Sequence, residues 1–491
     1  MRETAPPATA SAAARHRRPP RHRATAPPRA TGVHRTTCPT APRPPGPHRA
    51  SRPLFTSCLP RVHARRPARS RTRRSMGRAM NARSVERDTV QRTVAVVTES
   101  FLPTLNGVTT SVLAVLDHLE RRGHRAVVIA PDTPGLAQFR SRTQLERYRS
   151  FDVHRVPAVA YRQFPVALPH PVLDTILAAS GADVLHAASP FLLGGRAITA
   201  AGRLGIPSVA VFQTDVAGFA RRNGLTATVP LVRRILGRIH AGASLTLAPS
   251  SATAAMLAED GVPRVARWGR GVDTTLFHPD RRRSDAVRAA RRRIAPGGET
   301  IVGYVGRLAP EKEVERLAEL GGVPGIRVVV AGGGPSRASL ERRLRHLDVT
   351  FTGPLRGEAL ADAYAMLDVF VHTGPAETFG QTLQEAHATG LPVVAPAAGG
   401  PLDLVAPGLD GELYDPVVPQ ALRRAVLGLV GDPATAARMG SAGRLRVEGT
   451  TWEAVGDQLL AHHDSARTIG APPAVSRTAR AGWDEKVSAR A

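Results

Sequence analysis

The stretch DVFVHTGPAETFGQTLQEAHATGLPVVAPAA (residues 368–398) holds a strand, a loop, a helix and a second strand in one continuous sequence. Its ends, residues 368–374 and 392–398, are short apolar runs rich in valine, as expected of buried β-strands. The helix between them is predicted to begin near Phe379. Two apolar strands joined through a helix favour a parallel sheet covered by helices on both faces.

Similar apolar segments recur along the chain, separated by helical or turn-rich segments. The alternation pauses at a charged stretch, residues 279–299, whose end we interpret as a linker. The strand candidates are TVAVVTE (93–99), AVVIAP (126–131), DVLHAAS (183–189), SVAVFQT (208–214) and SLTLAPS (244–250) before this stretch, and TIVGYVGRL (300–308), IRVVVAGGG (326–334) and VTFTG (349–353) after it.

The sequence therefore predicts an α/β fold of two doubly wound Rossmann-like domains. We expect the first domain over residues 91–285 and the second, with its terminal helices, over residues 286–466, because 491 residues are too many for one ordinary core. A leader (1–90) and a tail (467–491) flank them. Ligands of such sheets bind at the carboxyl ends of the strands, so chemistry is expected in the loops there.

The leader is rich in Arg, Pro and Ala and has no hydrophobic periodicity. It carries 21 arginines, no lysine and three acidic residues, a net charge of +18 out of the chain's +27. Such a segment buries too little apolar surface to offset its ordering entropy, so disorder is predicted. Three interpretations stay open: a basic tail attracted to anionic lipid or nucleic acid, a transit peptide that the prolines disfavour, and a mis-assigned start with Met76 or Met80 as the first residue. The compositional break favours the last.

Composition also excludes several classes of protein. Both cysteines, Cys38 and Cys58, lie in the leader, so the body has no disulfide framework or cysteine-based metal site. No apolar run reaches transmembrane length and no secretory signal is present, so we expect a cytoplasmic protein with at most peripheral membrane contact. The sequence has no Asp-x-Asp motif and no His/Asp cluster with metal-ligand spacing, so we expect no metal and no cofactor. Aromatic residues make up only 4%, and no nucleic-acid motif occurs, so nucleic acid is not an expected partner.

Two glutamates mark the opening stretch as a candidate site. Glu377 precedes the predicted helix, and Glu385 lies about two turns further along it. A helix N-terminus offers free backbone N–H groups and positive potential to an anionic phosphate. Two carboxylates at this spacing can accept hydrogen bonds from two separate diols, such as those of a hexose and a ribose. The plain alternative, which the pair alone favours, is that Glu377 caps the helix and Glu385 is a solvated surface residue.

A basic pair follows the first strand of the second domain. In VGRLAPEKE (305–313), Arg307 and Lys312 stand five residues apart, and Lys312 is one of only two lysines in the chain. Arginine binds a phosphate through two hydrogen bonds and lysine acts as a point charge, so the pair can neutralise a diphosphate leaving group. The alternative is a surface arginine and a lysine paired with Glu311 or Glu313.

A third element turns out of the first strand into the first helix, FLPTLNGVTTSV (101–112). Gly107 would let the backbone approach a ligand closely at the N-terminus of that helix, or it is a simple turn glycine. AGGGP (331–335) is neither a GxGxxG fingerprint nor a P-loop, and a strand-to-helix turn is sufficient to explain it.

Together these elements resemble glycosyltransferase family four, of GT-B architecture, over about residues 92–466. Three further segments, 214–220, 372–381 and 395–405, look most like actinobacterial GDP-mannose-dependent α-mannosyltransferases. The segments that carry the family resemblance are ESFLPTLNGVTTSV, APSSATAAML, WGRGVDTTLFHP, VGYVGRLAPEK, VVVAGGGP, FTGPLRGEALADAYAMLDVFVHTG and ETFGQTLQEAHATGLPVVAPAAGGP.

The resemblance implies a retaining glycosyltransferase whose two domains face a central cleft. Arg307 and Lys312 would hold the donor diphosphate and stabilise charge on the departing nucleotide. Glu377 would contact the hydroxyls of the transferred sugar, which completes the catalytic set. Gly107, in the first domain, would approach the diphosphate from across the cleft.

The remaining donor-binding positions also come from the resemblance. Phe379 and Gly380 would offer backbone N–H groups to the sugar and phosphate, and Glu385 would bridge the ribose hydroxyls. Leu355 and Arg356 lie where the family reads the base, in a looser match.

The chain departs from the family at two places. The family often has Asn-Gly-Val-Asp where this sequence has Arg270-Gly271-Val272-Asp273. Many relatives place a histidine near the acceptor where this chain has Asp215, which would accept a hydrogen bond from an acceptor hydroxyl or merely cap the following segment. The acceptor is expected on first-domain loops, residues 101–110, 160–170 and 214–224. Their mix of apolar and basic residues suits an anionic membrane surface and equally an ordinary exposed loop.

The resulting hypothesis is metal-independent transfer of a hexose, mannose from GDP-mannose, to a glycolipid acceptor at the inner membrane face. Since Glu377 is committed to sugar binding, a front-face mechanism is preferred over a covalent nucleophile. One alternative is a UDP-sugar-dependent glucosyl- or galactosyltransferase of the same family. A more distant one is a non-catalytic scaffold whose basic leader binds nucleic acid or membrane.

Overall fold

The computed structural model describes residues 91–132, 144–161, 164–168, 170–222 and 224–472, which all belong to one compact unit of the chain. The predicted leader lies outside these residues, as does the predicted tail from residue 473 onward. Within the described part, no helix combines the length and the apolar character needed to cross a membrane.

The first sheet is built around β1 (Thr93–Thr98), whose six residues are all buried. The other strands are β2 (Arg125–Pro131), β3 (Gln144–Tyr148), β4 (Phe151–Val156), β7 (Val184–Ala188), β8 (Ser208–Val211), β9 (Leu245–Ala248) and β10 (Val265–Arg267). Their described order is β10-β9-β8-β7-β1-β2-β4-β3, parallel throughout except for β3 against β4. A separate antiparallel hairpin pairs β5 (Ala158–Tyr161) with β6 (Phe164–Ala167).

The second sheet is wholly parallel and contains the opening stretch of sequence. Its strands are β11 (Thr300–Val305), β12 (Ile326–Ala331), β13 (Val349–Gly353), β14 (Val369–Val371), β15 (Val393–Pro396) and β16 (Gly411–Tyr414), in the order β13-β12-β11-β14-β15-β16. The two apolar ends of the stretch become the neighbouring strands β14 and β15, as predicted.

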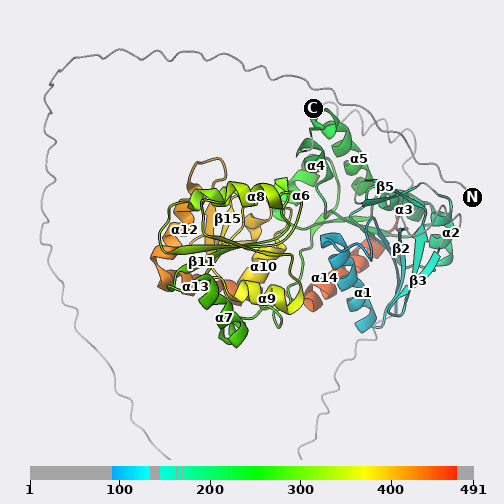
Figure 1. Ribbon diagram of the computed structural model, residues 1–491. Coiled ribbons are helices and arrows are strands. Elements are labelled where there is room, and N and C mark those ends of the chain that lie inside the picture. Colours follow the sequence, from blue (N-terminus) through cyan, green and yellow to red (C-terminus); the bar gives the residue numbers. More distant parts are fainter. Residues whose placement is uncertain (1–90, 133–143, 162–163, 169, 223, 473–491) are drawn as a thin grey trace, which may run out of the picture. The chain divides into compact units, whose positions relative to one another are not determined.

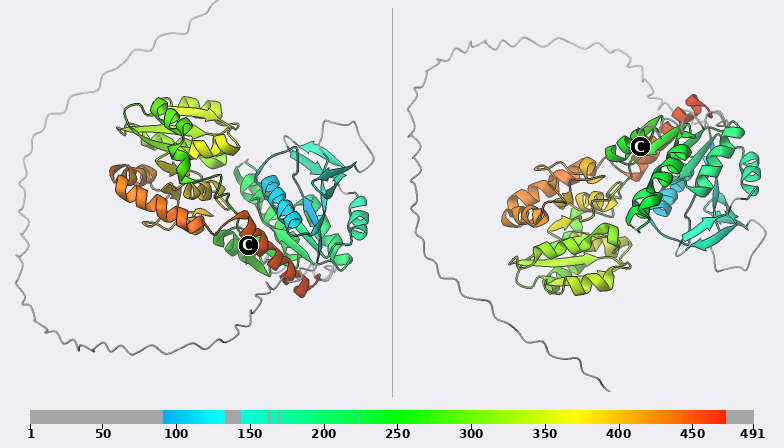
Figure 2. Two further views of the ribbon diagram at one scale, coloured as in Figure 1. Left: turned by 90° about the horizontal axis from the view of Figure 1, so that it is seen from below. Right: turned by 90° about the horizontal axis from the view of Figure 1, so that it is seen from above.

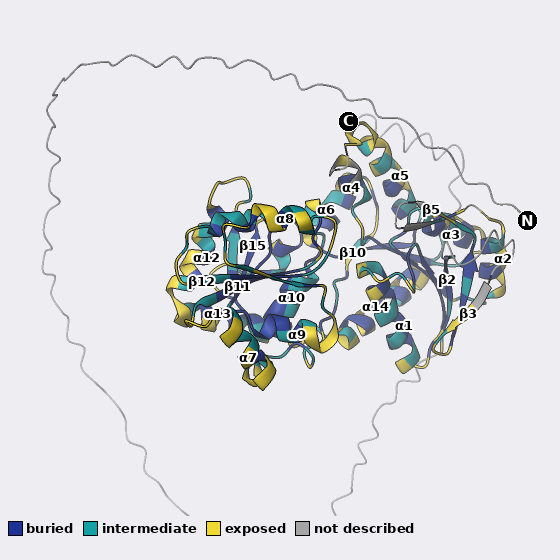
Figure 3. Cartoon of the chain, viewed as in Figure 1, coloured by how far each residue is buried: buried dark blue, intermediate teal, exposed yellow. Residues whose placement is uncertain are grey.

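Successive strand residues point to opposite faces of a sheet, and both faces of each sheet are covered. Along β11, Ile301 and Val305 join one core cluster, whereas Val302 and Tyr304 join another. The clusters on β1 divide in the same alternating way. The strands are continuous apolar runs in the sequence because both of their faces are buried. In Figure 3, buried strand residues are coloured dark blue.

Helices fill the connections between strands and lie on both faces of each sheet (Figure 1). Short 3-10 segments occur at Thr226–Thr228, Pro279–Arg283, Pro310–Lys312 and Val314–Leu320. The α-helices are α1 (Gly107–Arg121), α2 (Val172–Ala179), α3 (Leu192–Arg203), α4 (Val216–Arg222), α5 (Val229–Ala241), α6 (Ser251–Glu259), α7 (Asp285–Ile294), α8 (Arg337–Arg343), α9 (Gly357–Ala365), α10 (Gln381–Ala388), α11 (Pro401–Leu404), α12 (Ala421–Gly431), α13 (Pro433–Val447) and α14 (Trp452–Ile469).

The charged stretch 279–299 is largely helical, and its end, residues 295–299, where the linker was expected, lies outside the helices. Arg282 and Arg291 both pair with Asp368, which precedes β14 and also accepts a hydrogen bond from the Ile301 amide. Phe277, expected in the first domain, packs in the core of the second sheet. The second sheet therefore recruits residues ahead of the predicted boundary at 285/286, because Asp368 gives the arginines a partner that periodicity does not reveal.

The last helix also differs from the sequence-based division. We expected α14 in the second domain, but its residues Val455, Leu459 and Ala466 pack in the core of the first sheet. Trp268 anchors it by donating its indole N–H to the Val455 carbonyl at 3.0 Å. Figure 2 shows α14, in red, beside α1, in blue, from two directions. The physical reason is an apolar face on the first sheet that this helix covers.

Candidate active site

The candidate residues follow two neighbouring strands of the second sheet. β11 and β14 pair in parallel, so their carboxyl ends lie at the same edge. Arg307 and Lys312 come after β11, and Glu377 comes after β14. The sheet register therefore brings residues 65 positions apart in the sequence into one site.

The Lys312 ammonium donates a hydrogen bond to Glu377 Oε2 at 2.7 Å. The loop that carries it is fixed from the other strand, since Thr373 Oγ1 donates to the Lys312 carbonyl at 2.6 Å. Gly374 allows this close approach, because a Cβ there would lie 2.9 Å from the Glu311 carbonyl oxygen. The alternative in which Lys312 pairs with Glu311 or Glu313 is therefore wrong.

Glu377 is ionised at neutral pH. Burial by itself raises the pKa of this carboxyl, but the Lys312 charge and the hydrogen bonds from Lys312 and the Phe379 amide outweigh burial and set the pKa at about 2. Only 16% of the side chain is exposed. A buried carboxylate beside an ammonium group suits the binding of sugar hydroxyls, because it can accept their hydrogen bonds without first losing a proton.

Glu385 lies on α10 and behaves differently from Glu377. It is half-buried, and its Oε2 accepts a hydrogen bond of 2.7 Å from the Tyr364 hydroxyl. Burial raises its pKa to about 7, although the Tyr364 hydrogen bond acts in the opposite direction. The alternative in which Glu385 is an ordinary solvated residue is therefore wrong, and the two glutamates carry different charges below pH 7.

This pKa leads to a prediction about nucleoside binding. If the Glu385 carboxylate accepts hydrogen bonds from ribose hydroxyls, guanosine should bind about tenfold more tightly at pH 8 than at pH 6, since ionisation of a group with pKa near 7 changes about tenfold over that range. Guanosine avoids the titration of a phosphate. Calorimetry of the full chain and of Glu385→Gln measures the effect.

In Glu385→Gln the affinity should be low and independent of pH. A variant that keeps the full pH dependence would contradict the assignment. The free energy of unfolding gives an independent check. The folded chain holds the Glu385 proton more tightly than the unfolded chain does, because folding raises the pKa of Glu385 from 4.5 to about 7. The contribution of Glu385 to stability is therefore present below pH 4.5 and is lost as pH rises toward 7.

Arg307 does not share the environment of Lys312. Its side chain is 57% exposed and pairs with Glu311. The predicted basic pair is therefore divided: Lys312 lies against Glu377, whereas Arg307 is the exposed arginine of the alternative interpretation. Arg307 could bind an anion only after its ion pair with Glu311 is broken.

The loop before α10 is shaped by close backbone packing. The Phe379 amide donates to Glu377 Oε1 at 3.3 Å, so Glu377 already uses one of the two N–H groups predicted for the donor. Gly380, with φ +111°, ends the loop in the left-handed region that glycine favours. A Cβ on Gly400 would lie 2.0 Å from the Phe379 carbonyl oxygen, and one on Gly399 would lie 2.3 Å from the Glu377 carbonyl oxygen, which explains why the glycines of APAAGGP follow β15.

The three other predicted positions have local roles in the structure. Asp215 Oδ1 accepts from the Gly218 amide at 2.7 Å, as a helix cap does. Leu355 packs on the core of the second sheet, and the exposed Arg356 precedes α9. These contacts neither require nor oppose the acceptor and base roles, which stay predictions.

Two residues near the site were not predicted from the sequence. His372 follows β14 and is buried, with Nε2 3.7 Å from Glu377 Oε2, and neither ring nitrogen has a hydrogen-bond partner among the described residues. Burial lowers its pKa to about 4, so the imidazole is neutral. Arg270 lies beside Gly107, whose Cβ would be 3.1 Å from the Arg270 Nη1 atom. The sequence signals were a histidine inside an apolar strand run and an arginine where the family has asparagine.

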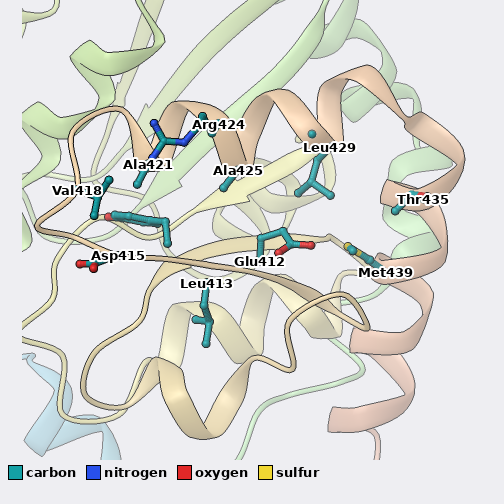
Figure 4. Close-up of a pocket in the computed structure, with 12 residues that line it drawn as sticks. Glu412, Leu413, Asp415, Val418, Ala421, Arg424, Ala425, Leu429, Thr435 and Met439 are labelled. Atoms are coloured by element: carbon teal, nitrogen blue, oxygen red, sulfur yellow. The ribbon is translucent and has the colours of Figure 1, made fainter. Parts of the chain in front are cut away.

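A cavity of about 530 Å³ lies elsewhere, between β16, α12 and α13 (Figure 4). Arg424 and Met439 are among its lining residues, and none of the predicted site residues is. It is therefore separate from the glutamate and lysine site. Among the described residues, no group of three or more His, Cys, Asp or Glu side chains could hold a metal ion.

Two family models match the chain. The model described as Glycosyltransferase Family 4 matches residues 105–276, and the one described as glycosyl transferases group 1 matches residues 288–446. The first match spans strands β2 to β10 and the second spans strands β11 to β16, and Phe277 lies between the two matches.

Curated relatives give the same family assignment, and a solved structure shows the same fold. The GDP-mannose-dependent alpha-mannosyltransferase of Mycolicibacterium smegmatis is 48% identical over 377 residues, which is 76% of this chain and 97% of the relative. The enzyme of the same name from Mycobacterium tuberculosis is 46% identical over 383 residues, again 76% and 97%. Sucrose-phosphate synthase from Thermosynechococcus elongatus shares the fold, with a TM-score of 0.61 at 22% identity over 76% of this chain and 98% of its own.

Proposed function

The chain belongs to glycosyltransferase family 4, and on that premise we propose that it transfers mannose from GDP-mannose to a hydroxyl group of a glycolipid acceptor. The observation that carries the proposal is the contact between Lys312 and Glu377 at the ends of β11 and β14. It places a positive charge for a leaving diphosphate next to an ionised acceptor for sugar hydroxyls. The names of the two relatives support mannose as the sugar and GDP as the nucleotide.

In the proposed reaction the bond between the sugar's anomeric carbon and the β-phosphate oxygen breaks, and its electron pair leaves with GDP. The acceptor hydroxyl oxygen forms the new bond to the anomeric carbon on the same face, so configuration is retained. The hydroxyl proton passes to the departing phosphate oxygen. Lys312 stabilises the negative charge that develops on this oxygen. Glu377 orients the mannose, and no side chain is used as a covalent nucleophile.

The decisive test is donor discrimination by the full chain. Incubation with labelled GDP-mannose and lipids extracted from actinobacterial membranes should give a labelled lipid product, and UDP-glucose should not. Thermal unfolding supplies a second measurement, since GDP at a hundred times its dissociation constant adds about 2.7 kcal/mol to stability. Stabilisation by UDP but not GDP would favour the UDP-sugar alternative. Neither nucleotide stabilising the chain, with no transfer from either donor, would contradict the proposal.

We also propose that the reaction needs no divalent metal. Charge on the leaving group is then neutralised by Lys312 and by Arg307 once released from Glu311. Activity should change less than twofold when EDTA replaces Mg²⁺ in the assay. A loss of activity that Mg²⁺ or Mn²⁺ restores would contradict this part of the proposal.

The proposed glycolipid acceptor requires contact with a membrane surface. Helix α5 supports this, because it exposes Leu231 and Ile235 on a segment that also contains arginines. Exposed apolar side chains on a basic helix are suited to an anionic bilayer interface. The full chain should co-sediment with vesicles containing anionic lipid and much less with neutral vesicles, and deletion of the leader separates its contribution from that of α5. Equal binding to both vesicle types would contradict the proposal.

A further inference from the structure

Arg270 is a half-buried arginine that lies where the two sheets' loops meet the start of α1. It follows β10, and its Nη2 donates to the Gln213 side-chain oxygen at 3.2 Å. Its Nη1 lies close to Gly107, at 3.1 Å from where a Cβ would stand. A Cβ at position 107 would require the guanidinium to move by a few tenths of an ångström, so the Arg270 side chain lies directly against Gly107.

No carboxylate among the described residues lies within ion-pair distance of Arg270. Several other buried or half-buried arginines do have such partners: Arg155 reaches Glu146 at 2.8 Å, and Arg281 reaches Asp362 at 2.7 Å. Burial lowers the pKa of Arg270, and the more distant charge of Glu377 acts in the opposite direction. Arginine nevertheless keeps its proton, so a positive charge is held here with one neutral hydrogen bond.

The neighbours of Arg270 add positive potential. α1 is a helix of 15 residues, and its N-terminus begins at Gly107. An arginine at this end of a helix is unfavourable, because the helix dipole is positive there. Gln213 adds another donor, since its side-chain Nε2 is buried and has no hydrogen-bond partner in the part of the chain that the structure describes. A cation, a helix N-terminus and an unpaired N–H donor together form a site for an anion.

We propose that Arg270 binds the diphosphate of the nucleotide-sugar donor from the side of the first sheet, opposite Lys312. The inference rests on the proposed function, which supplies the diphosphate. As the anomeric bond breaks, its electrons move onto the β-phosphate oxygen, and Arg270 stabilises that charge together with Lys312. Gln213 is a positioning residue, because its side-chain oxygen holds the guanidinium.

Arg270 also explains why the site tolerates the pairing of Arg307 with Glu311. The diphosphate would have two half-buried cations, Arg270 and Lys312, before Arg307 is recruited. Asparagine, which the family often has at this position, cannot supply a charge, so this chain would depend less on Arg307 than a relative with asparagine does.

The test compares nucleotide binding and turnover in Arg270→Gln, Arg270→Lys and unaltered full-length protein. Calorimetry with GDP and with guanosine isolates the phosphate contribution. We expect Arg270→Gln to weaken GDP binding at least tenfold, to leave guanosine binding unchanged and to lower kcat by about 10²- to 10³-fold. The GDP affinity and kcat of Arg270→Lys should lie between those of Arg270→Gln and those of the unaltered protein, because lysine keeps the positive charge but lacks the planar guanidinium group.

The matched control is Arg264→Gln. Arg264 donates only to the carbonyls of Ser244 and Ala243, so its loss removes a guanidinium without touching the proposed site. Thermal unfolding of each variant identifies loss of fold, and partial rescue of Arg270→Gly by added guanidinium is expected only if the group acts on the substrate.

Three outcomes decide the matter. GDP affinity and kcat in Arg270→Gln equal to those in Arg264→Gln would overturn the inference while leaving the proposed function intact. Unchanged GDP affinity with a raised KM for the acceptor would also overturn it, because Arg270 would then act on the acceptor. Absence of GDP binding and of mannose transfer in the unaltered protein would contradict the proposed function itself.

Discussion

Replacing Glu377 by alanine is expected to lower kcat by at least about 10³-fold, with a smaller effect on GDP affinity. The variant removes the ionised carboxylate that orients the transferred sugar and leaves the Lys312 ammonium half-buried without its 2.7 Å partner. Steady-state transfer from labelled GDP-mannose measures kcat, and calorimetry measures the affinity for GDP. The contrast with Glu385→Gln, which should mainly weaken nucleoside binding, separates the roles of the two glutamates.

The control for this variant is Glu341→Ala on α8. Glu341 also pairs with a cation, Arg337, but its side chain is 46% exposed, so its removal should leave kcat within about twofold. Equal activity in Glu377→Ala and Glu341→Ala would show that Glu377 has no part in transfer. Glu377→Gln should recover little, because an amide cannot pair with Lys312 as a carboxylate does.

Replacing Lys312 by methionine is expected to lower kcat by about 10²- to 10³-fold and also to destabilise the fold. Methionine keeps much of the side-chain volume but leaves the Glu377 carboxylate buried and unpaired. Removal of one partner from a buried ion pair lowers the free energy of unfolding by about 3–5 kcal/mol. Because the Lys312 and Glu377 side chains are 23% and 16% exposed, we expect a loss near the lower end of this range. Chemical denaturation measures the stability, and the transfer assay measures kcat.

The pH dependence of stability gives a sharper reading of the same pair. In the unaltered chain the pKa of Glu377 is lowered from 4.5 to about 2, so its contribution to stability is present above pH 4.5 and is lost as pH falls toward 2. In Lys312→Met the Glu377 carboxylate has no neighbouring ammonium group, so burial should raise its pKa above 4.5. The stability that the ionised Glu377 contributes in the unaltered chain should then be absent. An unchanged acid profile would mean that Lys312 does not set the charge of Glu377.

A double variant tests the coupling between the two side chains. Lys312→Met combined with Glu377→Gln removes both charges, so it should be more stable than Lys312→Met alone, although it stays inactive. If the loss of stability in the double variant equals the sum of the losses in the two single variants, the contact between Lys312 and Glu377 would be contradicted.

Much of the second sheet could be predicted from the sequence, because double burial leaves a simple pattern. The apolar runs around Phe370 and Val394 became the neighbouring strands β14 and β15, and the helix between them begins at Gln381, two residues after the predicted start at Phe379. The contact between Lys312 and Glu377 was not predicted, because β11 and β14 are not consecutive in the sequence and only the strand order shows that their loops share an edge.

Other features could not be predicted, because they depend on partners distant in the sequence. Spacing alone left Glu385 as a solvated helix residue, since nothing near it in sequence indicates that Tyr364 donates a hydrogen bond to it. The sequence did not show that the arginines of α7 and of the segment before it pack against the second sheet, because their partner Asp368 is distant in the sequence. Arg270 could not be assigned a site because its neighbours, Gly107 and Gln213, come from distant loops of the first sheet.

The packing of α14 on the first sheet has a consequence for synthesis of the chain. The first sheet is translated early, but the helix that covers Val94 and Val96 leaves the ribosome only after the whole second sheet has been made. Until then, that apolar face is open to chaperones or to neighbouring chains. A fragment that stops before Trp452 should therefore aggregate unless residues 452–469 are supplied in trans, and an exchange of first domains between relatives should move this helix together with the sheet.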